Sequence, residues 1–254
     1  MVRHLAVLLL SALTLACGPG EDTPDPASGV PAAADGTPTT APDGDTPDAT
    51  GHPRVIFLGT SLAAGLGLDD PDASYVGQVA AIADSVGRPI DAVNAGISGD
   101  TSAGGLRRLD WLIRDPLDVL VLELGANDGL RGQSTEALAE NLGAIIERTR
   151  SRHPNAAVVL AGMEAPPNLG RSYTEAYRQV FADVAREYDA VLVPFLLEGV
   201  AGDPELNQAD GIHPTVVGHR RMAETLWPYL EDALARVDDA AQATSGAPAG
   251  QGAA

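Results

Sequence analysis

The chain has 254 residues, a formal net charge of −19 at pH 7 and no lysine. This charge argues against nucleic acid as a partner, because phosphate binding needs a cluster of cationic side chains. The only cysteine is Cys17, which excludes an internal disulfide.

The N-terminal segment has two parts. Residues 1–17 combine Arg3 with an apolar run over 5–15, which is too short to span a bilayer and is typical of a secretory signal peptide. Cys17 follows this run as in a bacterial lipobox, so we expect it to become a lipidated N-terminus. An ordinary signal peptide with an incidental cysteine is the alternative. Residues 18–53 hold eight of the 19 prolines and seven acidic residues, and we expect a disordered tether there.

Residues 54–237 are predicted to form one folded domain, followed by a disordered, low-complexity tail over 238–254. In the domain, short aliphatic runs alternate with amphipathic stretches of helical periodicity. This alternation predicts an α/β fold, with a parallel sheet buried on both faces under helices. The expected order is a strand over 55–58, a helix over 75–86, strands over 90–93 and 119–124, a helix over 135–150, a strand over 157–161, a helix over 173–188, a strand over 190–194 and a helix over 215–236.

Polar residues follow several of these strands, at the sheet edge where ligands of such folds bind. Ser61, in "GTSL", is either a nucleophile or a helix N-cap; the α/β-hydrolase elbow G-x-S-x-G is absent, because Ala63 takes the place of its second glycine. In "DGIHP", a turn could bring the Asp210 carboxylate to Nδ1 of His213 and so orient Nε2 as a base. A capping aspartate beside a surface histidine is the alternative.

Two further loops carry candidates for binding negative charge. Asn127, in "GAND", could donate a side-chain amide N–H to an oxyanion, and Gly99, in "ISGDTS", could present its backbone N–H. Asparagine and glycine are also common in ordinary turns, which is the alternative for both residues. His219 and His213 could with Asp210 suggest a metal site, but their spacing points them to different helix faces. We therefore expect no metal.

The four blocks "GTSL", "ISGDTS", "GAND" and "DGIHP", in this order, resemble those of the SGNH (GDSL-type) hydrolases. Over residues 54–234 the chain is similar to the bacterial periplasmic thioesterase/lysophospholipase (arylesterase) type. The resemblance implies a three-layer α/β/α, flavodoxin-like fold with a five-stranded parallel sheet. One departure is Thr60, which stands where the family has an aspartate before the nucleophile; we expect altered support of the oxyanion loop and retained chemistry.

The resemblance also implies the chemistry. Ser61 would be the nucleophile, His213 the base and Asp210 its partner, with an oxyanion hole formed by the N–H groups of Ser61 and Gly99 and the side chain of Asn127. We expect a serine acyl hydrolase that cleaves carboxylic esters or thioesters without a metal or organic cofactor. A carbohydrate O-acetyl esterase of the same superfamily and a catalytically dead lipid-binding lipoprotein are the alternatives.

The loop after the fourth strand corresponds to one that helps to bind the acyl chain in the resembling enzymes. Its apolar residues would line the acyl site, or else pack against the following helix. We expect the protein to be a monomer, anchored by lipid on the periplasmic side of a bacterial cell envelope. The predicted acyl-binding residues are Met163, Pro166, Pro167 and Leu169.

Overall fold

The computed structural model describes residues 51–245, and five parallel strands form its central sheet. The strand order is β2-β1-β3-β4-β5, which is the flavodoxin-like order of a doubly wound sheet. The middle strands are continuous apolar runs because helices cover both of their faces. The predicted α/β/α fold is thus confirmed. The strands are β1 (Arg54–Gly59), β2 (Asp91–Gly96), β3 (Val119–Leu122), β4 (Ala157–Ala161) and β5 (Val191–Val193).

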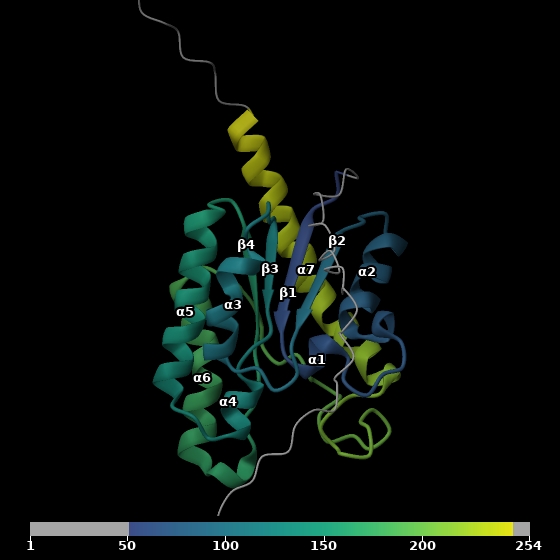
Figure 1. Ribbon diagram of the computed structural model, residues 1–254, viewed down its shortest axis with the longest axis vertical. Helices are drawn as coiled ribbons and strands as arrows, with labels where there is room; N and C mark the ends of the chain where they lie inside the picture. The colour runs from purple at the N-terminus through teal and green to yellow at the C-terminus, as the bar shows by residue number, and fades with distance from the viewer. Residues whose placement is uncertain (1–50, 246–254) are drawn as a thin grey trace, which may run out of the picture. The chain divides into compact units, whose positions relative to one another are not determined.

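Helices form the two outer layers (Figure 1). On one face, α2 (Tyr75–Ser85) packs beside the long α7 (Val216–Ser245). On the other face lie α3 (Ser102–Leu112), α5 (Thr135–Arg152) and α6 (Arg171–Glu187). Within residues 51–245, no helix is both long and apolar enough to cross a bilayer. Short elements complete the fold at the carboxyl ends of the strands: α1 (Ser61–Ala64), η1 (Pro71–Ala73), α4 (Ala126–Leu130) and η2 (Pro167–Leu169).

Strand β2 differs from the sequence prediction of 90–93. It runs to Gly96, because it pairs residue for residue with β1, from Arg54 opposite Asp91 to Gly59 opposite Gly96. As an edge strand it is only partly buried, and its second half, the Asn-Ala-Gly of residues 94–96, contains no branched aliphatic residue that would indicate a strand.

Helix α3 lies between two strands where the sequence analysis predicts no helix. Thr101 caps it, with its side chain accepting from the Gly104 N–H. A Cβ at Gly105 would lie 2.2 Å from Leu124 Cδ1. The glycines that weaken the helix signal therefore allow the helix to pack closely against the end of β3.

The ends of helix α7 and of strand β3 also differ from the sequence prediction. Helix α7 continues to Ser245, so the expected disordered tail from residue 238 is wrong over 238–245. Strand β3 ends at Leu122, two residues earlier than expected. The predictions for residues 1–50 and 246–254, which include Cys17, lie outside the described residues.

Candidate active site

Three predicted residues meet at the carboxyl edge of the sheet. Ser61 opens α1 directly after β1, and its Oγ lies 3.0 Å from Nε2 of His213. The other ring nitrogen, Nδ1, lies 2.6 Å from Oδ2 of Asp210. This geometry places a hydroxyl, an imidazole and a carboxylate in one hydrogen-bonded chain, in which the imidazole can accept the serine proton.

Asp210 is held by the turn that carries His213. Its Oδ1 accepts the backbone N–H groups of Ile212 at 2.9 Å and His213 at 3.0 Å. The hydrogen bonds from the His213 side chain and these two N–H groups hold the pKa of the Asp210 carboxyl well below its usual range. Asp210 therefore remains ionised and can stabilise an imidazolium on His213.

Ser61 is not a helix N-cap. Thr60 occupies that position, with extended backbone angles, and its hydroxyl accepts from the Leu62 N–H. The Ser61 N–H belongs to the first turn of α1, where the backbone N–H groups have no intrahelical acceptor. Both the hydroxyl and the backbone N–H of Ser61 are thus placed at the site.

A buried carboxylate that the sequence analysis missed lies beneath this turn. Glu123 follows β3 and accepts from the Thr60 N–H at 3.0 Å, the Thr60 hydroxyl at 2.8 Å and the Ala63 N–H at 3.2 Å. Burial raises the pKa of Glu123 to about 7, although these three bonds and the charge of Arg108 lower it. An aspartate at position 60 would face Glu123 with a second carboxylate, whereas the threonine hydroxyl donates a hydrogen bond to it. The only sequence signal was an acidic residue at the end of an apolar run.

The candidate oxyanion residues come from the next two strand ends. Asn127 lies in α4, and its Nδ2 donates to the Asp100 carbonyl at 2.9 Å. This bond fixes the orientation of the amide and uses one of its two N–H groups, and the other N–H takes no part in it. Gly99 has a φ of +80°, a conformation that favours glycine. Its carbonyl accepts from Arg131 Nη2 at 3.0 Å, so the residue that ends α4 also holds this loop.

Arg108 connects the nucleophile strand to the oxyanion loop. Its guanidinium donates to the Gly59 carbonyl at 3.0 Å, the Ala95 carbonyl at 2.6 Å and the Asp100 carboxylate at 2.8 Å. The ends of β1 and β2 and the residue after Gly99 are therefore held by one side chain. The sequence does not indicate this role, because Arg108 lies in α3, a segment for which no helix was predicted.

An apolar cavity of about 570 Å³ opens beside Ser61 and His213. Met163, Pro166 and Pro167 line it, whereas Leu169 is not part of its wall and is 37% exposed; the role of these four residues in binding an acyl chain stays a prediction. Leu169 belongs to η2, and its Cδ2 would lie 3.7 Å from a Cβ at Gly132. The wall also includes residues that the sequence analysis did not single out: Leu66, Leu130, Phe195, Leu197 and Ile212.

His219 has a structural role instead of a place in a metal site. Its Nδ1 accepts from the Tyr75 N–H at 3.1 Å, and its ring stacks on that of Tyr75. Burial, with a contribution from the charge of His213, lowers the pKa of His219 to about 4. Across the described part of the chain, no cluster of three His, Cys, Asp or Glu side chains could hold a metal ion.

A doubly wound parallel sheet that brings a serine, a histidine and an aspartate together beside an apolar cavity at its carboxyl edge is an arrangement that can support serine-hydrolase chemistry. The model of the GDSL-like Lipase/Acylhydrolase family matches residues 57–221. The chain is 42% identical to Esterase TesA of Pseudomonas aeruginosa over 181 residues, which cover 71% of this chain and 89% of the relative. It is 38% identical to Thioesterase 1/protease 1/lysophospholipase L1 of Escherichia coli K12 over 184 residues, covering 72% and 81%.

The solved structures agree with the sequence matches. A crystal structure of TesA superimposes with a TM-score of 0.68 at 41% identity, covering 71% of this chain and 99% of that one. The chain belongs to the GDSL-like lipase/acylhydrolase family, and the predicted resemblance is confirmed. It is a carboxylic ester hydrolase of this family.

Proposed function

We propose that Ser61 is the nucleophile of a serine acyl hydrolase, with His213 as general base and Asp210 as its partner. The observation that carries this proposal is the hydrogen-bonded chain of 3.0 Å and 2.6 Å that joins the three side chains at the mouth of an apolar cavity. The hydrogen bonds also argue against a catalytically dead lipid-binding protein, since such a protein has no need of an aligned base.

The reaction follows from this geometry. His213 Nε2 takes the Ser61 proton while Oγ attacks the ester or thioester carbonyl carbon, and Asp210 stabilises the resulting imidazolium. The tetrahedral intermediate collapses, and the imidazolium returns the proton to the leaving alcohol or thiol. Water, deprotonated by His213, then attacks the acyl-enzyme, and as the second tetrahedral intermediate collapses His213 returns this proton to Ser61 Oγ and the acid is released.

The oxyanion would be bound by the N–H groups of Ser61 and Gly99 and by the Asn127 amide. These donors are fixed before the reaction, since Glu123 holds the turn around Ser61 and Asp100 holds Asn127. One donor of this kind is worth about 2.7–4 kcal/mol in the transition state.

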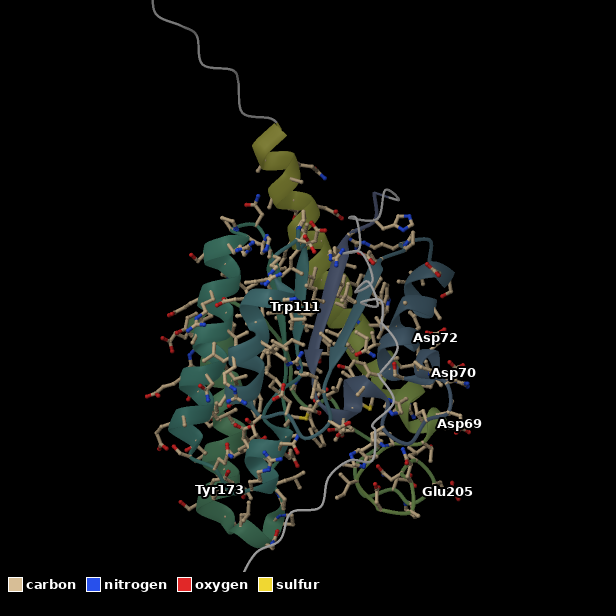
Figure 2. All side chains as sticks on the ribbon, in the orientation of Figure 1. Asp69, Asp70, Asp72, Trp111, Tyr173 and Glu205 are labelled. Carbon is tan, nitrogen blue, oxygen red and sulfur yellow. The ribbon has the colours of Figure 1, made fainter. Side chains whose placement is uncertain are left out.

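The substrate is proposed to be an ester or thioester with an apolar acyl chain. The cavity supports this, because its wall beside Ser61 is built mainly from aliphatic, proline and phenylalanine side chains. The name of the Escherichia coli relative includes thioesterase and lysophospholipase, which supports the same classes of substrate here. A carbohydrate substrate has less support: Trp111, which is 65% exposed, lies toward the far end of α3 from the site (Figure 2).

The place of the enzyme in the cell is proposed from the sequence. A signal peptide over 1–17, the lipobox-like Cys17 and the proline-rich segment 18–53 support a domain that is tethered by lipid to the cell envelope.

The test is hydrolysis of a panel of p-nitrophenyl esters from acetate to palmitate by the wild type and by Ser61→Ala. We expect Ser61→Ala to lose activity and to keep its circular dichroism. Ser85→Ala is the matched control, because this hydroxyl bonds only to the Ile82 carbonyl on α2 and should leave rates unchanged. Activity of Ser61→Ala above a few per cent of wild type would refute the nucleophile. Hydrolysis confined to acetate would favour the O-acetyl esterase.

A further inference from the structure

Most of the segment that carries His213 is exposed, although Leu206 packs against the core and Pro214 is buried. Residues 201–205 and 209–212 are exposed, and Glu205 points away from the body of the protein (Figure 2). Its backbone forms a closed turn, in which the Gln208 N–H donates to the His213 carbonyl at 2.7 Å and the Gly211 N–H to the Gln208 carbonyl at 2.9 Å. These bonds shape the turn internally, but they do not attach it to the element that carries Ser61.

The side chain of Gln208 makes that attachment. Its Nε2 donates to the Leu66 carbonyl at 2.8 Å and to the Pro214 carbonyl at 2.9 Å, so both amide protons are used. Leu66 is itself bonded to the nucleophile, because its N–H donates to the Ser61 carbonyl at 3.0 Å. Pro214 directly follows His213. One amide thus joins the chain just after α1 to the residue beside the imidazole.

The chain around Leu66 is shaped to admit this amide. A Cβ at Gly67 would lie 2.1 Å from Gln208 Oε1, and Gly67 has a φ of +82°. Glycine at this position therefore serves both the turn and the close approach of Gln208.

We propose that Gln208 is a positioning residue, which fixes the His213 imidazole against the Ser61 hydroxyl. This inference rests on the proposed function of the two residues. Proton transfer from Oγ to Nε2 needs a short, aligned contact, and a displacement of about 1 Å can cost about 10²-fold in rate. Because the His213 segment is exposed, the two bonds of Gln208 limit that displacement where packing does not.

The test is Gln208→Met, which keeps the length of the side chain and removes both donors. Gln78→Met is the matched control, since Gln78 Nε2 also donates to two carbonyls, those of Ala73 at 2.8 Å and Val216 at 3.1 Å, away from the site. With p-nitrophenyl butyrate, we expect Gln208→Met to lower kcat by about tenfold or more and to leave KM within about twofold. Gln78→Met should change neither constant. A comparable loss of kcat in both variants, or a wild-type kcat in Gln208→Met, would overturn the proposal.

The pH profile separates positioning from a change in the base. The Asp210–His213 bond does not involve the Gln208 side chain, so the pH midpoint of kcat should stay in place while the plateau falls. A shifted midpoint would show instead that the Asp210–His213 pair had changed, and would overturn the positioning role. If Gln208→Met does not fold, Gln208→Glu replaces it at pH 8, because an ionised carboxylate has the same shape and no donor.

Ser61→Ala distinguishes the two proposals. If Ser61→Ala remains active, the proposed function fails. If Ser61→Ala is inactive and Gln208→Met is fully active, only the positioning role fails.

Discussion

Replacing Glu123 by glutamine should change how the stability of the fold depends on pH. The glutamine Oε1 can still accept the N–H groups of Thr60 and Ala63, and its Nε2 can donate to the Thr60 hydroxyl, so the turn around Ser61 is kept. What is lost is a buried group that ionises. Burial raises the pKa of Glu123 from 4.5 to about 7.

The direction follows from the raised pKa. Below pH 4.5 the carboxyl is protonated in both the native and the unfolded chain, and it contributes no pH dependence. Between pH 4.5 and 7 the unfolded chain releases the proton while the native chain keeps it, so the free energy of unfolding falls as pH rises. Above pH 7 the carboxyl is ionised in both states, and the free energy of unfolding falls no further. The difference between the native and the unfolded pKa of Glu123 corresponds to about 3 kcal/mol.

The assay is urea denaturation at a series of pH values from 4 to 8.5 for wild type and Glu123→Gln. The free energy of unfolding of the wild type should fall by about 3 kcal/mol relative to the variant across this range. Glu140→Gln is the control, because Glu140 is exposed on α5, and its curve should run parallel to that of the wild type. Parallel curves for wild type and Glu123→Gln would refute the reasoning.

The remaining predictions concern the oxyanion, the acyl site and the anchor. Asn127→Ala should lower kcat by about 10²–10³ with little change in KM, because its donor acts mainly in the transition state; an unchanged kcat in steady-state assays would contradict this. Leu197→Ala should shift the chain-length profile of kcat/KM by at most a few-fold per carbon, at about 0.8 kcal/mol per methylene, whereas Leu169→Ala, outside the cavity, should not; equal profiles for both would place the acyl chain elsewhere. Cys17→Ser should release the protein from membranes into soluble fractions, and identical partitioning of both forms on fractionation would exclude the lipid anchor.

The sequence by itself determined the class of fold and the residues of the proposed catalytic chain. Val119–Leu122 is a continuous apolar run, which is typical of a strand that is buried on both faces. In α5 and α6 the apolar residues recur with helical periodicity, and this periodicity indicates the face of each helix that is buried. Ser61, Asn127 and His213 could be placed at one edge because every strand of a parallel sheet ends there. These properties are local, or follow from the order of local elements along the chain.

Only the tertiary structure decided what supports that catalytic chain. Glu123 reaches Thr60 across 63 residues, and Gln208 reaches Leu66 across 142. Nothing in the residues next to Glu123 or Gln208 indicates these partners, because each contact depends on the packing of strands and loops that are distant in the sequence. The same reason explains Leu169: its apolar character was visible in the sequence, but its absence from the cavity wall depends on how η2 packs in the folded chain. Periodicity indicates which face of an element is buried, whereas the contacts of a single side chain are fixed only when the elements pack together.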